Sequence, residues 1–316
     1  MKDVLTISCV NFATAWRKKE ANLKRILEYI ESAARCGTDV IVFPEMCLTG
    51  YDDADKTSDL PSAERHSCLM AETVPGPSTT EVAKITEKYG IYAVFGMPER
   101  DSNNSELCYN AAAVIGPQGV IGTHRKTHLP FYEMKWAQRG DYPFIFETQW
   151  GPIGVTICYE SYVFPELVRY YRAMGCRLVL NVTAAGILPG ETVTRENVRD
   201  SIEYHVANNS VYYATANLFG KEYEQDYMGG SSIVGPGNKS TSYYYYAGKP
   251  FTDPDAANGV MVTATIDLSL AERSFLTSQW HSDDQSKLPD YRPELYIKLN
   301  EEIQRKFGTY VKNDVK

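Results

Sequence analysis

The sequence of 316 residues lacks several features that would connect it with membranes or nucleic acids. No apolar run approaches the roughly 20 residues needed to cross a bilayer. No basic run occurs either, and 32 Lys and Arg against 40 Asp and Glu leave a net charge of −8, so neither nucleic acid nor an anionic membrane surface is an expected partner. The opening residues, MKDVLTISCVNF, do not have the layout of a signal peptide. We therefore expect a cytoplasmic enzyme that acts on a small molecule.

The cysteines lack the spacing of a metal site or of a disulfide framework. Their number is odd, no two of them form a CxxC pair, and no Cys/His cluster has metal-ligand spacing. The seven cysteines are scattered over positions 9, 36, 47, 68, 108, 158 and 176. We expect reduced thiols and no structural zinc.

Apolar strand patterns alternate with helical patterns along most of the chain. The first helical pattern, residues 20–36, lies between strand patterns at 4–12 and 40–44 and predicts a β-α-β opening. The alternation continues with predicted helices at 79–89, 165–175 and 192–209 and with predicted strands at 91–97, 109–116, 119–126, 151–157, 177–183, 211–217, 231–235, 240–248 and 259–267. Two similar sets of strands and helices predict two packed sheets covered by helices in one α/β domain. The run of four tyrosines at 243–246 favours an amphipathic strand at an edge or interface.

The last segment, residues 279–316, differs from the rest of the chain. It is polar and interrupted by Pro289 and Pro293, so it is unsuited to forming a core of its own. It nevertheless carries an apolar stripe made of Tyr291, Leu295, Tyr296, Leu299, Ile303 and Phe307. Because an isolated stripe needs a partner surface, we expect a domain at residues 1–278 followed by a C-terminal arm at an oligomer interface.

Cys158 stands where a predicted strand ends and the chain bends towards a helix that Pro165 and Glu166 suit at its first turn. A nucleophile at such a point can face a cleft at the carboxyl end of a sheet, close to backbone N–H groups that bind an oxyanion. An arbitrary cysteine at a strand end is more often a small buried apolar residue. The interpretation of Cys158 therefore depends on its companions.

Two further strand ends carry charged residues. Glu45 follows the apolar stretch VIVFP, where a carboxylate is either the solvent-facing start of a loop or a group held in a pocket for use. Lys126 ends another strand, and a lysine in such a place is usually solvated when it stands alone. Taken together with Cys158 at one sheet edge, they offer the base, the oxyanion partner and the nucleophile that acyl transfer needs.

Three motifs resemble, in this order, the nitrilase superfamily of carbon–nitrogen hydrolases: FPEMCLTGY, HRKTHLP, and GVTICYE followed by FPE. The catalytic Glu, Lys and Cys of that superfamily lie in these motifs, and the matching positions are Glu45, Lys126 and Cys158. The resemblance extends from residue 4 to about 270. It implies a four-layer α-β-β-α sandwich, thioester chemistry, no metal or organic cofactor, and a homodimer or higher homo-oligomer built through the face beside the active site.

A fourth position, Glu133 in PFYEMKWAQRG, matches the second Glu that family members often carry between the Lys and the Cys. The chain departs from the family at residues 205–209, where HVANN stands in place of the usual Arg-Ala-x-Glu-Asn, so that Asn208 occupies the position of the Glu. This departure leaves the catalytic set intact.

The residues and the resemblance together predict hydrolysis of a small amide or N-carbamoyl compound by water. In this prediction Glu45 is the base, Lys126 and the backbone N–H of Tyr159 stabilise the oxyanion, and Glu133 orients the lysine or the substrate nitrogen. The candidate substrate-binding residues, a mixture of aromatic and small side chains, are Tyr51, Phe131, Trp136, Tyr159 and Ala184.

Two other functions stay open. A nitrilase that attacks a C≡N group would use the same Glu, Lys and Cys, but that branch usually follows the cysteine with Trp-Glu, whereas Tyr159-Glu160 stands here. From a different class, the chain could be a catalytically silent binding protein. The intact catalytic set argues against this, and selective alkylation of Cys158 would separate the two.

Overall fold

The computed structural model describes residues 1–51, 59–130, 132–187, 194–222, 225–237, 242–272 and 291–308. By contacts within the chain it separates into two compact units, Met1–Glu272 and Arg273–Lys316. Within the described residues, no helix is both long enough and apolar enough to cross a membrane.

The first sheet has six strands in the order β15-β1-β2-β3-β4-β5. They are β1 (Val4–Val10), β2 (Val40–Val42), β3 (Tyr92–Arg100), β4 (Cys108–Gly116), β5 (Gly119–Arg125) and β15 (Met261–Asp267). The central strands β1, β2 and β3 run parallel, and the outer strands join antiparallel.

The second sheet repeats this plan in the order β14-β13-β10-β8-β7-β6. Its strands are β6 (Ile145–Thr148), β7 (Gly151–Ile157), β8 (Leu178–Thr183), β10 (Tyr212–Asn217), β13 (Ser232–Gly235) and β14 (Tyr244–Ala247). Here β7, β8 and β10 are the parallel strands. The tyrosine run forms β14 at the edge of the sheet, as its pattern predicts.

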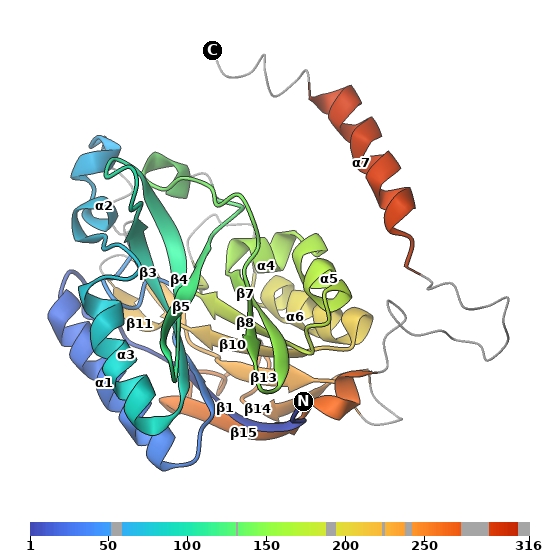
Figure 1. The fold of residues 1–316 in the computed structure, drawn as a ribbon, viewed down its shortest axis with the longest axis horizontal. Coiled ribbons are helices and arrows are strands. Elements are labelled where there is room, and N and C mark those ends of the chain that lie inside the picture. The colour runs from blue at the N-terminus through green and yellow to red at the C-terminus, as the bar shows by residue number, and fades with distance from the viewer. Residues whose placement is uncertain are drawn as a thin grey trace, which may run out of the picture. The chain divides into compact units, whose positions relative to one another are not determined.

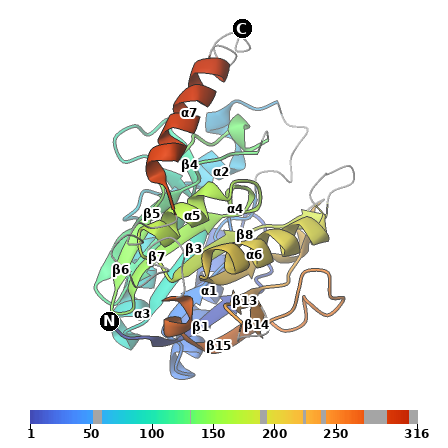
Figure 2. The same cartoon turned by 90° about the vertical axis from the view of Figure 1, so that its right-hand side faces the viewer.

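Helices cover the outer face of each sheet, so the molecule has four layers (Figures 1 and 2). On the first sheet lie α1 (Lys19–Arg35) and α3 (Pro77–Tyr89), and on the second lie α5 (Glu166–Ala173) and α6 (Arg195–Asn209). In α1, Ile26, Ile30 and Ala33 recur at helical spacing and are buried. Between the sheets lies an apolar layer that includes Val94 and Val155. The predicted α-β-β-α sandwich is confirmed.

Several short elements were not predicted, because elements of two to five residues leave little periodicity to detect. They are helix α2 (His66–Met70), helix α4 (Tyr159–Val163), the edge strand β6, the 3₁₀ turns Ser62–Glu64, Glu133–Lys135 and Leu268–Glu272, and a small third sheet of β9 (Gly186–Ile187), β11 (Phe219–Glu222) and β12 (Gln225–Met228). The helix expected at 165–175 is therefore α5 preceded by a separate turn of helix, α4.

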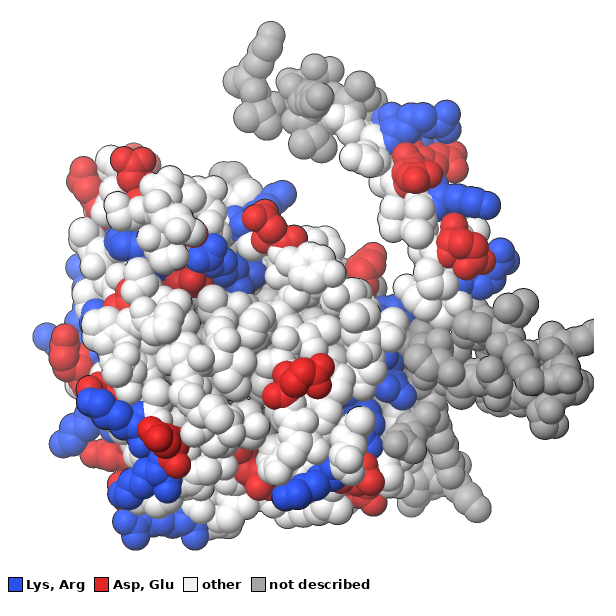
Figure 3. Space-filling view, in the orientation of Figure 1, with Lys and Arg blue, Asp and Glu red and all other residues white. Residues whose placement is uncertain are grey.

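Charged side chains of both signs are interspersed on the surface. In the orientation of Figure 1, uncharged side chains dominate the centre of the visible face, and Lys, Arg, Asp and Glu gather mostly towards its margins (Figure 3). This face therefore carries no extended field of one sign.

The second unit contains helix α7 (Pro293–Phe307), which begins with the proline of the predicted arm. None of its residues is buried, and its exposed apolar side chains are Leu295, Tyr296, Ile297, Leu299, Ile303 and Phe307. The rest of the predicted arm, 279–290 and 309–316, lies outside the described residues.

Candidate active site

The predicted catalytic residues stand just beyond the ends of strands. Glu45 follows β2, and Lys126 directly follows β5, both in the first sheet, whereas Cys158 directly follows β7 in the second. Glu133 begins a 3₁₀ turn, Glu133–Lys135. The site is thus assembled from both sheets of the sandwich.

The loop that carries Glu45 lies directly on strand β3. The backbone N–H of Gly96 donates to the carbonyl of Pro44 at 3.0 Å. A Cβ atom at Gly96 would stand 2.5 Å from the Cα of Glu45, so only glycine permits this approach. On the other side, the Glu45 N–H donates to the carbonyl of Thr183, at the end of β8, at 3.4 Å. The backbone of Glu45 is therefore held between the two sheets.

Lys126 forms ion pairs with both glutamates inside the protein. Its Nζ atom lies 2.8 Å from Glu45 Oε1 and 2.6 Å from Glu133 Oε1, and none of the three side chains is exposed. Burial alone lowers the pKa of Lys126, but the charges of Glu133 and Glu45 raise it well above its usual value overall. Burial raises the pKa of Glu133, with Lys126 opposing that rise and Glu45 adding to it. The lysine is therefore a permanent ammonium.

Two neutral side chains complete this cluster. Asn110, buried in β4, donates from Nδ2 to Glu45 Oε1 at 2.7 Å and to Glu133 Oε2 at 3.1 Å. The Tyr51 hydroxyl donates to Glu133 and lies 3.3 Å from Glu45 Oε1. Oε1 of Glu45 thus accepts from Lys126 and Asn110, whereas its buried Oε2 has no hydrogen-bond partner among the described residues.

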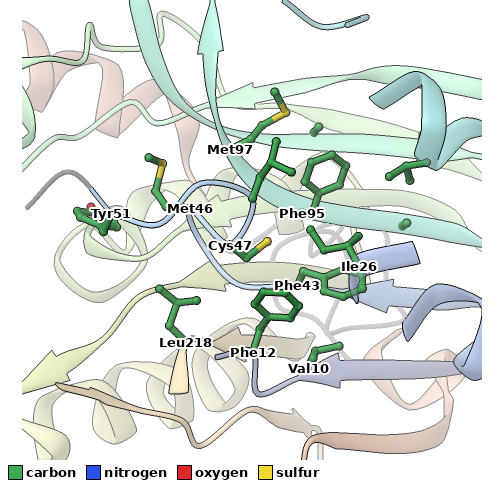
Figure 4. Close-up of a cluster of buried hydrophobic side chains, with 14 of the residues drawn as sticks. Val10, Phe12, Ile26, Phe43, Met46, Cys47, Tyr51, Phe95, Met97 and Leu218 are labelled. Carbon is green, nitrogen blue, oxygen red and sulfur yellow. The ribbon is translucent and has the colours of Figure 1, made fainter. Parts of the chain in front are cut away.

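Sequence reasoning missed Asn110. The available signal was a lone amide side chain within the apolar strand YNAAAVIG, since a buried amide requires partners. Tyr51 was predicted only as a wall residue. Figure 4 shows it beside Met46, on the loop after β2, at one end of the apolar cluster that also contains Phe43. That packing directs the ring, and its hydroxyl reaches the glutamates.

Cys158 occupies a backbone conformation that residues other than glycine seldom adopt. Its φ of +48° lies in the left-handed region. The conformation is held on both sides, because Cys158 N–H donates to the Val182 carbonyl at 3.0 Å and the Cys158 carbonyl accepts from Ser161 N–H at 2.8 Å. Tyr159 then begins α4, so its N–H has no carbonyl partner within that helix.

The surroundings of Cys158 keep its thiol protonated at rest. Burial raises the pKa of the thiol, and the Glu45 carboxylate raises it further. The Lys126 ammonium acts in the opposite direction. A thiol in this state needs a base at the moment of attack.

A cavity joins the thiol and the lysine to the surface. It encloses about 340 Å³ of empty space, counted to its open mouth. The described residues that line it are Tyr51, Lys126, Pro130, Tyr132, Cys158, Tyr159, Ala184, Gly186, Gln225 and Tyr227. Lys126 is the one charged side chain among them, and the rest of the described wall is uncharged, with four tyrosines and one glutamine.

The predicted substrate-binding residues separate into three groups. Tyr51, Tyr159 and Ala184 line the cavity. Trp136 does not, because its side chain is 1% exposed and belongs to the apolar cluster that also contains Phe43. Phe131 lies outside the described residues.

Among the residues that the structure describes, there is no group of three or more His, Cys, Asp or Glu side chains that could hold a metal ion.

A family model for carbon–nitrogen hydrolases matches residues 6–243. The chain belongs to the carbon–nitrogen hydrolase family. This carbon–nitrogen hydrolase is 32% identical over 247 residues to an omega-amidase of Xenopus tropicalis, covering 73% of this chain and 80% of that protein. It is 26% identical over 288 residues to a probable nitrilase of Schizosaccharomyces pombe, covering 90% and 96%.

Solved structures show the same fold for this carbon–nitrogen hydrolase. An amidase from Nesterenkonia sp. superposes with a TM-score of 0.69 at 19% identity, over 95% of this chain and 97% of that one. A Saccharomyces cerevisiae protein of branch 10 of the nitrilase superfamily superposes with a TM-score of 0.68 at 22% identity, over 85% and 92%. The resemblance to the nitrilase superfamily is confirmed.

Proposed function

We propose that this hydrolase cleaves the C–N bond of a small amide through a thioester on Cys158. The observation that carries the proposal is the state of Glu45. One of its oxygens accepts from Lys126 and Asn110, and the other is buried with no partner among the described residues. An acceptor left open beside a thiol that is protonated at rest is the arrangement of a general base.

In the first half of the proposed reaction, Glu45 Oε2 takes the thiol proton while the sulfur attacks the amide carbon. The new C–S bond moves an electron pair onto the amide oxygen. The Lys126 ammonium and the N–H of Tyr159 stabilise that negative charge, and losing one such donor typically costs ~3 kcal/mol, about a hundredfold in rate. Glu133 and Asn110 keep the lysine and Glu45 in place.

In the second half, Glu45 returns its proton to the departing nitrogen, the C–N bond breaks, and ammonia or an amine leaves. Water then attacks the thioester and gives a proton to Glu45. The C–S bond breaks, Glu45 returns this proton to the sulfur, and the carboxylic acid product leaves, so that both the thiol and the carboxylate are restored. A single carboxyl group therefore serves as base and then as acid in each half of the reaction.

The relatives and the described cavity wall support an amide as substrate. The Nesterenkonia amidase has been solved with the acetamide moiety of fluoroacetamide attached to its active-site cysteine and with butyramide in a cysteine mutant. Apart from Lys126, the described wall is uncharged and contains four tyrosines and one glutamine, which favours a small uncharged amide or N-carbamoyl compound for this chain. A nitrile is the second candidate, because relatives from Schizosaccharomyces pombe and Pyrococcus abyssi carry the name nitrilase.

Ammonia release from a panel of uncharged amides, anionic amides, N-carbamoyl compounds and nitriles tests the proposal. We expect the uncharged amides to be turned over fastest and mass spectrometry with a slow amide to find an acyl adduct on Cys158. Cys158→Ala should abolish turnover and stay folded, whereas the matched control Cys36→Ala, at an exposed thiol, should keep it. Turnover by Cys158→Ala, or an adduct on another cysteine, would refute the mechanism. A nitrile hydrolysed faster than every amide would establish the second candidate.

A further inference from the structure

A second buried carboxylate, Glu160 in α4, lies close to the site, although it does not line the described cavity. Its side chain is fully buried and accepts four hydrogen bonds. His124 Nε2 lies 2.5 Å from Oε1, and the Ile157 N–H donates to the same oxygen at 2.8 Å. Thr127 donates to Oε2 twice, from its backbone N–H at 2.9 Å and from its hydroxyl at 2.8 Å.

These donors keep Glu160 ionised. Burial alone raises the pKa of its carboxyl group, but the charge of His124 and its hydrogen bond, followed by the two bonds from Thr127, hold the pKa below its usual value overall. An ionised carboxylate only accepts hydrogen bonds, so His124 Nε2 must carry a hydrogen. All four donors therefore point at one negative charge, which makes the bonds stronger than those between neutral groups.

The donors are the chain neighbours of the two groups that react in the proposed mechanism. Ile157 directly precedes Cys158, and Thr127 directly follows Lys126. Ile157 ends β7 in the second sheet, whereas Lys126 follows the end of β5 in the first. Glu160 thus joins the two sheets at the edge where the site lies. The apolar layer between the sheets attracts without direction, so it does not by itself fix the separation of two strand ends.

We propose that Glu160 is a positioning residue that holds the Lys126 ammonium and the Cys158 sulfur at the separation that acyl transfer requires. The proposal rests on the proposed function in taking Lys126 and Cys158 as the reacting pair. It assigns a role to the Glu of the ICYE motif and to the Thr of HRKTHLP.

The first test compares kcat and KM in two variants. Glu160→Gln replaces one accepting oxygen with an NH₂ group that faces N–H donors, so the strand ends should separate. A displacement of about 1 Å typically costs a hundredfold in rate, and we expect kcat to fall by about that factor. KM should stay within about threefold, because three of the four tyrosines that line the cavity, Tyr51, Tyr132 and Tyr227, lie on other segments than Glu160. Thr127→Val removes the hydroxyl bond to Glu160, together with the 2.9 Å contact of that hydroxyl with His128 Nδ1, and should lower kcat by about fivefold.

The second test needs no amide substrate. The Lys126 ammonium lowers the pKa of the Cys158 thiol, so moving it away should raise the pH midpoint of alkylation by iodoacetamide. A rise of one pH unit reduces the alkylation rate at neutral pH by about tenfold. Because this measurement follows the thiol itself, it tests Glu160 even if every amide in the panel proves inert. Failure of the proposed function and failure of this proposal can therefore be told apart.

Glu72→Gln is the matched control. Glu72 is also buried and accepts from Ser78 N–H at 2.8 Å and from the Ser78 hydroxyl at 3.0 Å, and it pairs with Lys19 at 2.8 Å, away from the candidate site. This variant should melt at a lower temperature and keep its kcat. The proposal is overturned if folded Glu160→Gln keeps wild-type kcat and alkylation, or if both Gln variants lose kcat in parallel with their melting temperatures. Should Glu160→Gln fail to fold, Thr127→Val decides, and wild-type values there overturn the proposal as well.

Discussion

Replacing Lys126 with methionine tests the electrostatic description of the site. The ammonium lies 2.8 Å from Glu45 and 2.6 Å from Glu133, and all three side chains are fully buried. Methionine preserves most of the length and apolar volume of the side chain but leaves two carboxylates without a cation. Removing one partner of a buried ion pair typically costs about 3–5 kcal/mol. At about 2 °C per kcal/mol for a unit of this size, the melting temperature at pH 8 should fall by roughly 6–10 °C.

The loss of stability in Lys126→Met should depend on pH in a defined direction. Burial already raises the pKa of Glu133 while Lys126 opposes that rise, so the pKa should climb further once the lysine is gone. An unfolded glutamate ionises near ~4.3. At a pH between the pKa of unfolded glutamate and the higher pKa of Glu133 in the folded variant, the folded state holds a proton that the unfolded state has released. The contribution of Glu133 to the free energy of unfolding is therefore complete at low pH and is lost as pH rises, by up to about 1.4 kcal/mol per pH unit.

Thermal unfolding followed by circular dichroism between pH 5 and pH 8 measures both effects. The deficit of Lys126→Met relative to wild type should be largest at pH 8 and should shrink towards pH 5. Lys84→Met is the matched control, because Lys84 pairs with Glu81 at 2.5 Å on the surface, where ion pairs contribute little. A Lys126→Met protein that melts with wild type at pH 8, or a deficit that grows as pH falls, would refute the reasoning.

Two further predictions concern the carboxylates and the arm. Glu45→Gln should block acylation and deacylation. Glu133→Gln should leave Cys158 open to alkylation yet stop turnover, because Glu133 orients its partners and does not take the thiol proton. Iodoacetamide labelling and ammonia release measure these effects, and wild-type kinetics in both variants would show that the site is misplaced. We also propose that the C-terminal arm covers a second copy of the chain, because α7 exposes its apolar stripe. Deleting residues 279–316 should lower the mass seen by light scattering or the melting temperature, and a full-length chain that is monomeric at micromolar concentration would contradict the idea.

The sequence predicted the parts of the site that depend on local pattern. Glu45, Lys126 and Cys158 each follow a strand that the sequence predicted. The expectation that they share one sheet edge was wrong, because Glu45 and Lys126 follow strands of the first sheet and Cys158 follows a strand of the second. The helices of the outer layers were also predicted, because apolar residues that recur every three to four positions are a local pattern. For α6 the helix begins at Arg195, where the Thr194 hydroxyl accepts from the Asn197 N–H.

The parts that the sequence did not predict depend on tertiary pairing. Gln225 and Tyr227 reach the cavity because β12 pairs with β11 and with the very short β9, and a strand of two residues has no periodicity to detect. Trp136 was expected at the cavity wall from its place in a motif, but the direction of a side chain after a 3₁₀ turn is set by packing. Asn110 could be linked to the glutamates only through the register of β4 with β3.

The electrostatics of the cluster explain how a thiol that is protonated at rest can still react. With Lys126, Glu45 and Glu133 ionised and Cys158 neutral, the four groups carry a net charge of −1. When the thiol proton passes to Glu45, the charge leaves that carboxylate and appears on sulfur, so the net charge is unchanged. The repulsion by Glu45 that raised the pKa of the thiol disappears in the same step, while the attraction of Lys126 for the sulfur persists. In the proposed mechanism, formation of the thiolate therefore requires no charge from solvent, so the step is compatible with a buried cavity.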